Sequence, residues 1–141
     1  LGPEPLSDDF TSSYLAAAIK GRRQPVKSFL LDQRRIAGLG NIYADEALFL
    51  AGIDPRRVAG SLTQGKCRVL VAAIQHVLTD GITDGGTTFR DYRNGAGGRG
   101  HHQEHLFVYH REGKPCTICG KPIEKITVGG RGTHFCPHCQ H

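Results

Sequence analysis

Apolar residues recur at helical spacing through the first 80 residues of the chain and predict four helices. The predicted helices cover residues 7–20, 25–33, 41–51 and 62–78. Ser7 is a suitable cap for the first helix and Gly21 follows its end, while Pro25 suits the first turn of the second. Gly52 closes the third, and the fourth, which is the most clearly amphipathic, carries Cys67 in its apolar stripe. The pattern indicates a small all-helical domain in which Cys67 is a buried core residue.

The regular pattern ends after the fourth helix. Residues 90–104 contain many glycines together with arginines and histidines, without periodicity, and predict a mobile loop. Residues 105–110 contain Leu, Phe, Val and Tyr in succession and predict a short strand that leads into the cysteines. A small β unit is therefore expected to follow the helical domain.

Four of the five cysteines form two C-x2-C pairs with sixteen residues between them: Cys116, Cys119, Cys136 and Cys139. This spacing is typical of a tetrahedral zinc site with four thiolate ligands. Because four thiolates leave no open position for water, we expect one structural zinc and not a catalytic one. Residues 123–128 and 133–136 can pair as a hairpin around a turn at 129–132, and metal binding supplies the folding free energy that so small a unit lacks.

Three further side chains near the cysteines leave more than one role open. His134 and His138 could be metal ligands, but the thiolates already complete the site, which favours positions at the surface or beside the ligands. Arg131 lies between glycines at the predicted hairpin tip. It is either an ordinary solvated turn residue or a guanidinium presented to a phosphate, and the local sequence favours neither.

The charge balance favours a polyanionic partner without identifying it. The chain has 18 Lys and Arg against 13 Asp and Glu, a formal net charge of +5. Basic residues concentrate in 20–35 and again after residue 90, although a solvated surface accounts for either cluster equally well. The apolar runs are too short for a membrane helix, and residues 1–10 lack the pattern of a signal peptide. With cysteines spaced for metal, these features predict a protein of a reducing compartment.

Four segments are similar in sequence to motifs of a known family: residues 1–6 (LGPEPL), 31–46 (LDQRRIAGLGNIYADE), 85–88 (GGTT) and 130–137 (GRGTHFCP). Together they resemble formamidopyrimidine-DNA glycosylases, and the match spans essentially the whole chain. The resemblance implies a mainly α fold, with a four-helix helix-two-turn-helix DNA-binding domain over 1–89 and a small four-cysteine zinc β-hairpin, or zinc ribbon, over 105–141. It identifies 90–104 with the family's flexible lesion-recognition loop, which closes over an everted base.

The resemblance also implies an activity. Members of the family remove oxidised purines, such as formamidopyrimidine and 8-oxoguanine, from double-stranded DNA and then cut the backbone as abasic-site lyases. A monomer that binds DNA with an oxidised base or an abasic site is therefore implied. In intact relatives a preceding β-sandwich domain carries the catalytic N-terminal proline in cis, and these 141 residues do not include it. The nitrogen of Pro3 is acylated by Gly2 and cannot form a Schiff base, so we expect DNA binding without turnover unless an amine such as Lys27 reacts.

Several residues are implied as DNA contacts: Arg23, Lys27, Gly38, Gly40, Asn41 and Arg131. Asn41 would hold a phosphate at the positive end of a helix, where the two glycines let the DNA backbone approach closely; a plain helix cap is the alternative role. Arg131 matches a zinc-hairpin arginine that contacts phosphates around the flipped nucleotide. That arginine takes part in the final elimination by proton transfer or by charge stabilisation, and a permanently charged guanidinium suits the second role better.

Three other functions remain open from the sequence. An endonuclease VIII-type enzyme of the same superfamily prefers oxidised pyrimidines, and the Gly- and His-rich composition of 95–102 departs from the aromatic-containing loops of oxidised-purine readers. A stand-alone zinc-ribbon module would bind DNA without catalysis. A zinc-ribbon protein–protein adaptor would have no salt-dependent affinity for DNA, whereas a protein that neutralises phosphates binds more weakly as salt rises.

Overall fold

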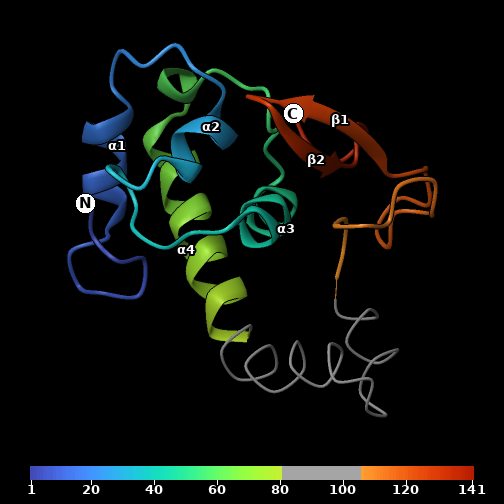
Figure 1. Ribbon diagram of the computed structural model, residues 1–141, viewed down its shortest axis with the longest axis horizontal. Helices are drawn as coiled ribbons and strands as arrows, with labels where there is room; N and C mark the ends of the chain where they lie inside the picture. The colour runs from blue at the N-terminus through green and yellow to red at the C-terminus, as the bar shows by residue number, and fades with distance from the viewer. Residues whose placement is uncertain (81–105) are drawn as a thin grey trace.

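Four α-helices, one 3-10 helix and a two-stranded hairpin form the part of the chain that the computed structural model describes, residues 1–80 and 106–141 (Figure 1). The elements are α1 (Ser12–Ile19), α2 (Val26–Leu31), α3 (Asn41–Ala51), η1 (Ala59–Ser61), α4 (Gln64–Asp80), β1 (Glu124–Val128) and β2 (Arg131–Phe135). Helix α3 contacts α4 on one side and β2 on the other. The predicted fold class, mainly α with a small zinc hairpin, is confirmed.

The apolar core of the helical part lies where α4 packs against α1 and α3. Cys67, Leu70 and Ile74 of α4 have no exposed surface, as the amphipathic pattern predicts. Phe29 from α2 and Leu48 from α3 are equally buried in the same cluster. Each large apolar side chain removed from water contributes roughly 1.5–3 kcal/mol, so this core fixes α3, the helix that borders the hairpin.

Helix α3 is buried over most of its circumference because other elements cover it on two sides. Residues 44–49 are all buried, and they include the acidic pair Asp45 and Glu46. The helix is followed by Gly52 in the left-handed conformation, with φ of 71°, which glycine adopts without steric cost. The predicted bounds of this helix are confirmed.

The first helix begins later than predicted. Its cap is Thr11 and not Ser7: Thr11 Oγ1 accepts a hydrogen bond from the backbone N–H of Tyr14 at 3.0 Å. The Ser7 hydroxyl instead donates to the carbonyl oxygen of Glu4 at 2.7 Å. The prediction was wrong because that hydroxyl serves a turn in the segment before the helix.

The other helix ends shift by small amounts. Helix α2 stops at Leu31, two residues before the predicted end, because Asp32 Oδ1 accepts the backbone N–H of Arg34 at 3.0 Å and forms a local turn. Helix α4 begins and ends two residues later than predicted. Its start follows Thr63, whose Oγ1 accepts the backbone N–H of Lys66 at 3.1 Å.

The hairpin is antiparallel, and its turn is tighter than predicted. Gly129 and Gly130 form the turn with φ of 57° and 78°, and Val128 pairs with Arg131. Arg131 therefore begins β2 and is not part of the turn. A Cβ added to Gly129 would lie 2.6 Å from Ser28 Oγ, so the turn packs closely on α2.

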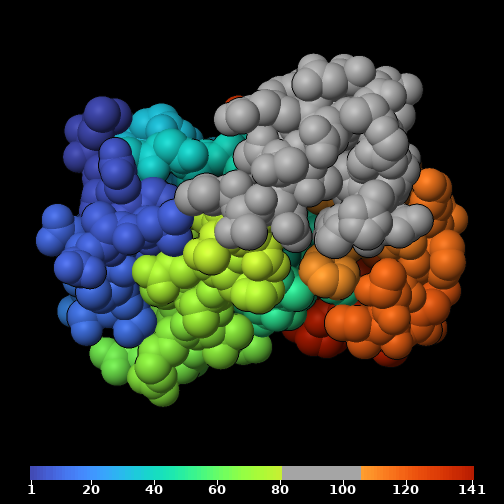
Figure 2. All heavy atoms as spheres, turned by 90° about the horizontal axis from the view of Figure 1, so that it is seen from below, coloured from blue at the N-terminus to red at the C-terminus, as the bar shows by residue number. Residues whose placement is uncertain are grey.

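A second apolar cluster joins the zinc finger, here residues 106–141, to the helical part: Phe49, Val108, Cys116, Ile123 and Cys136. The helical part and the orange-to-red zinc finger occupy opposite sides of the face in Figure 2. The finger thus rests on α3 through one aromatic side chain, Phe49, and few apolar residues of its own.

The strand predicted over 105–110 is wrong for the residues that the structure describes. Residues 107–110 form bends and turns, and residue 106 has no regular structure. The carboxylate of Glu46 accepts the backbone N–H groups of Phe107, Val108 and Tyr109 at 2.7, 2.8 and 3.0 Å. Because a side chain satisfies these donors, they do not pair with another strand.

Residues 81–105 lie outside the described part of the chain. The predicted loop over 90–104 and the predicted domain limits at residues 89 and 105 fall there and stay predictions. In the two described stretches, no helix has both the length and the apolar composition that crossing a membrane requires.

Candidate nucleic-acid interface and zinc centre

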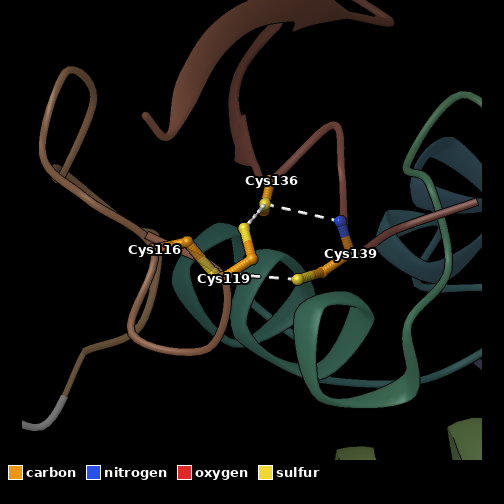
Figure 3. A group of neighbouring side chains, drawn as sticks. All are labelled: Cys116, Cys119, Cys136 and Cys139. Carbon is orange, nitrogen blue, oxygen red and sulfur yellow. Dashed lines mark hydrogen bonds between the residues drawn. The ribbon is translucent and has the colours of Figure 1, made fainter. Parts of the chain in front are cut away.

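The four paired cysteines converge at one point of the finger (Figure 3). Their sulfur atoms all lie within 4.8 Å of one another, with Cys116 Sγ 3.9 Å from Cys139 Sγ and Cys119 Sγ 3.5 Å from Cys136 Sγ. Four thiolates around a zinc at about 2.3 Å in a tetrahedron would lie about 3.8 Å apart. The cluster therefore fits one structural zinc with a complete ligand shell.

Backbone N–H groups point at the sulfur atoms, as in metal-binding knuckles. Ile118, Lys121 and Cys139 each donate a backbone hydrogen bond to a cysteine sulfur at 3.4 Å. Burial opposes ionisation of Cys116, but such backbone hydrogen bonds outweigh it and lower the pKa of that thiol to about 7. Burial and the neighbouring sulfurs raise the pKa of Cys139 to about 12. Four thiolates in one place thus need a cation to hold them together.

The second feature is the exposed N-terminus of α3. Its capping position is Gly40, which has no side chain that could cap the first turn. A Cβ added at Gly40 or at Gly38 would meet nothing within 4 Å, and Gly38 adopts φ of 81°. The helix therefore has an N-terminus without a side-chain cap beside an exposed glycine, and the positive dipole end there suits an anion.

Asn41 joins this helix end to the hairpin. Its Nδ2 donates to the carbonyl oxygen of Gly132 at 3.1 Å. The oxygen of the same amide, Asn41 Oδ1, is buried and has no hydrogen-bond partner among the described residues. Arg131, the residue before Gly132, is exposed, so the structure brings Arg131, Asn41 and the two loop glycines to one region.

Lys27 does not lie on this surface. Its side chain has no exposed area, and its Nζ contacts Asp45 Oδ1 at 2.7 Å, Gly132 O at 2.9 Å and Thr133 Oγ1 at 2.7 Å. Burial lowers the pKa of Lys27, and the Arg131 charge adds to this, while Asp45 opposes both. Its direct contact with DNA stays a prediction, since the ammonium is enclosed at the joint between α2, α3 and β2.

His134 is buried, so of the two expected positions, at the surface or beside the ligands, the surface one is wrong. Its Nδ1 lies 3.0 Å from Asp45 Oδ2, and its backbone N–H donates to the same oxygen at 2.9 Å. Its Nε2 faces Glu112 Oε1 at 3.6 Å. His138, by contrast, is exposed. Neither histidine belongs to the group of metal-ligating side chains found among the described residues.

Arg23 is exposed in the connection between α1 and α2. Within residues 1–80 and 106–141, no hydrogen bond or ion pair links it to Asn41 or Arg131. Its role as a DNA contact stays a prediction that rests on the resemblance and on its exposed charge.

Sequence reasoning missed the polar residues that attach the finger to the helices, namely Asp45, Glu46, Thr133 and Gln140. Gln140 is buried; its Oε1 accepts the N–H of Cys136 at 2.7 Å and its Nε2 donates to Ile53 O at 2.9 Å. One signal was available: Asp45 and Glu46 interrupt an otherwise apolar helix, and buried carboxylates require partners. Thr133 and Gln140 carry no comparable signal.

Two family models match the chain. The model described as the formamidopyrimidine-DNA glycosylase H2TH domain matches residues 1–93, and the one described as the zinc finger found in FPG and IleRS matches residues 113–141. The first match covers the helical part, and the second covers most of the zinc finger.

Individual proteins are similar over the whole chain. The formamidopyrimidine-DNA glycosylase of Chloroflexus aggregans is 54% identical over 99% of this chain and 50% of that protein. The Lactococcus lactis Fpg in complex with DNA containing an abasic site superposes with a TM-score of 0.87, at 41% identity, covering 100% of this chain and 52% of that one. The L. lactis complex with Fapy-dG DNA also has a TM-score of 0.87, at 39% identity, covering 100% and 51%.

The chain thus spans about half the length of the relatives that it matches. The matching half contains both the bare helix end and the four-cysteine cluster described above. On these grounds, the chain belongs to the formamidopyrimidine-DNA glycosylase family.

Proposed function

We propose that this chain is the DNA-binding and zinc-finger half of a base-excision-repair DNA glycosylase and abasic-site lyase that removes oxidised purines from DNA. One observation carries the proposal: the exposed Arg131 begins the strand whose Gly132 carbonyl is bonded to Asn41, at the bare N-terminus of α3. A guanidinium beside free helical amides suits a phosphate of the DNA backbone.

The substrate is double-stranded DNA with an oxidised purine or an abasic site, bound by a monomer in the bacterial cytoplasm at the nucleoid. Support comes from relatives at half coverage: the L. lactis structures hold DNA with an abasic site and with Fapy-dG. In this proposal Asn41 and Arg131 hold the phosphates, while Gly38 and Gly40 allow the close approach of the backbone. Arg23 adds a more distant phosphate contact.

The lyase step requires an amine nucleophile, and the buried lysine in the described part of the chain is not free to act as one. Lys27, the suspected alternative nucleophile, is fully buried and held by three oxygen atoms, so it cannot reach a sugar aldehyde. We propose that the nucleophile lies in the half of the relatives' length that this chain does not span. Arg131 then stabilises the charge that develops on phosphate oxygens during elimination.

The test is the affinity of the chain for a duplex with an abasic-site analogue, measured by fluorescence anisotropy over a range of salt concentrations. Arg131→Ala should weaken binding and reduce the slope of log K against log salt by about 1. Arg68→Ala, which removes an exposed arginine of α4, is the matched control and should alter binding less. The proposed role of Arg131 would be rejected if the affinity did not change with salt concentration, or if Arg131→Ala and Arg68→Ala reduced the affinity equally.

A further inference from the structure

We propose that Asp45 is a positioning residue for DNA binding: through Lys27 and Thr133, it fixes the backbone of β2 so that Arg131 stands at the N-terminus of α3. The inference rests on the proposed function, because it assumes that Arg131 binds a phosphate. Asp45 itself is buried and touches no surface that DNA could reach, with 1% of the residue exposed.

Asp45 holds two elements at once with its two carboxylate oxygens. Oδ1 lies 2.7 Å from Lys27 Nζ of α2, and Oδ2 accepts the backbone N–H of His134 in β2 at 2.9 Å. The His134 ring nitrogen Nδ1 lies 3.0 Å from the same Oδ2. Side chains of this ionic group are 0–2% exposed, so little water competes for them.

Lys27 passes this constraint to the residues next to Arg131. Its ammonium donates to the Gly132 carbonyl at 2.9 Å and to Thr133 Oγ1 at 2.7 Å. The Thr133 hydroxyl in turn donates to the carbonyl oxygen of Arg131 itself at 2.9 Å. A continuous series of polar contacts therefore runs from Asp45 through Lys27 and Thr133 to the Arg131 backbone.

The same contacts set the distance between Arg131 and the helix end. The Gly132 carbonyl accepts hydrogen bonds from both Lys27 and Asn41, so the buried ammonium and the first residue of α3 hold the same peptide of β2. If Lys27 lost its carboxylate partner, a buried cation would remain close to the Arg131 charge, and β2 would move to relieve it.

A structural contribution alone does not account for this arrangement. A buried ion pair is often no more stabilising than apolar residues of the same volume, because both charges lose their hydration. The Lys27–Asp45 pair supplies a fixed geometry: Asp45 of α3 holds the ammonium, and the other two acceptors of that ammonium, Gly132 O and Thr133 Oγ1, lie on β2.

A double-mutant cycle separates positioning from simple stability. Asp45→Asn keeps the shape and an acceptor for the His134 amide but removes the charge that holds Lys27. Affinity for the abasic-site analogue should fall roughly tenfold or more, and the salt slope should fall by about 1, as though the Arg131 contact were lost. In an Arg131→Ala background, Asp45→Asn should change neither quantity.

Asp54→Asn is the matched control. Asp54 also forms an ion pair, with Arg56 at 2.8 Å, but it lies beyond the C-terminal end of α3, and its replacement should leave affinity unchanged. Thr133→Val provides a second variant that keeps the side-chain volume and removes only the hydroxyl, in case Asp45→Asn fails to fold. It should also weaken binding only when Arg131 is present.

The outcomes distinguish the two proposals. If Arg131→Ala alone leaves affinity unchanged, the proposed function of that residue fails. Two results would overturn the positioning role while leaving the role of Arg131 in place. In one, Arg131→Ala weakens binding but Asp45→Asn and Thr133→Val do not. In the other, Asp45→Asn and Thr133→Val weaken binding as much in the Arg131→Ala background as in the parent chain. Zinc content, measured for every variant, should stay at one per chain.

Discussion

The helical part and the zinc finger are stabilised in opposite ways. The helical part has one continuous apolar core to which α1, α2, α3 and α4 all contribute. The buried cluster of the finger is much smaller; two of its members are zinc ligands, Cys116 and Cys136, and a third, Phe49, belongs to α3. The finger therefore depends on metal and on its neighbour for a stability that the helices obtain from burial.

The joint between the two parts differs from both in being largely polar. Asp45 and Lys27 hold β2, Glu46 holds the segment that enters the finger, and Gln140 ties the second cysteine knuckle to the residue after Gly52. Polar contacts have strict geometry, whereas apolar packing tolerates small shifts. Arg131 therefore lies in the less stable part of the molecule but is oriented by the more stable part.

Removing the zinc should have the largest effect, because it acts on the finger, the part with the smaller apolar cluster. Chelation, or Cys136→Ser, should unfold the hairpin, because structural zinc contributes on the order of 10 kcal/mol to such units. The helical core contains no ligand and should persist. Amide hydrogen exchange checks both: residues of β1 and β2 lose protection, while Leu70 and Ile74 in α4 retain it.

The control is Cys67→Ser, which changes the fifth cysteine and should leave zinc content unchanged because Cys67 is buried in the helical core. If α4 amides lost protection together with the hairpin on chelation, the two parts would form one cooperative unit, and the contrast between them would be wrong.

A cavity in the helical core should have the next largest effect, in the opposite region. Leu70→Ala should lower the free energy of unfolding of the helical part by about 2–5 kcal/mol, because Leu70 is fully buried. Val69→Ala, at the neighbouring position with 47% exposure, should change it by less than about 0.5 kcal/mol. Urea unfolding followed by helical circular dichroism measures both, and a similar loss for the two variants would contradict the assigned core.

Periodic burial explains why the helices could be predicted from the sequence. Helix α3 was placed correctly at both ends, since Gly40 and Gly52 mark its limits. The start of α1 could not be placed, because Ser7 and Thr11 are both good caps and only the fold shows which hydroxyl meets a free N–H. Residues 106–110 have a strand-like composition, yet the Glu46 carboxylate, 61 positions before Phe107 in sequence, accepts the N–H of Phe107.

The residues of the candidate site also fall into those that local sequence predicts and those that depend on distant contacts. The zinc ligands follow from spacing within short segments, so Cys116 and its partners could be predicted. The position of Lys27 could not, because its three partners lie in α3 and β2, more than 100 residues away in the case of Gly132 and Thr133. The resemblance implied a lysine in contact with DNA, whereas long-range pairing with Asp45 buries its ammonium.

The smallest predicted effect concerns an exposed ion pair, Asp32–Arg34, which joins an aspartate to a basic side chain as the buried pair at the joint does. Asp32 Oδ2 accepts a hydrogen bond from Arg34 Nη2 at 2.9 Å, and Arg34 is 81% exposed. The hydrogen bonds from Arg34 lower the pKa of Asp32 from its usual 3.8 to about 2. Because the folded pKa lies below the unfolded one, the pair contributes fully above pH 3.8, and the contribution disappears as the pH falls through about 2.

Asp32→Asn should therefore be slightly less stable than the parent chain near pH 6, and the difference should vanish as the pH falls below about 2. Water and salt screen an exposed pair, so the difference should shrink further as salt is added. The amide oxygen of asparagine still accepts the Arg34 backbone N–H, which keeps the turn after α2 and isolates the charge. Thermal unfolding with zinc chelated throughout reports on the helical part alone. A destabilisation as large as that of Leu70→Ala would mean that an exposed charge, and not apolar burial, limits the stability of the helices.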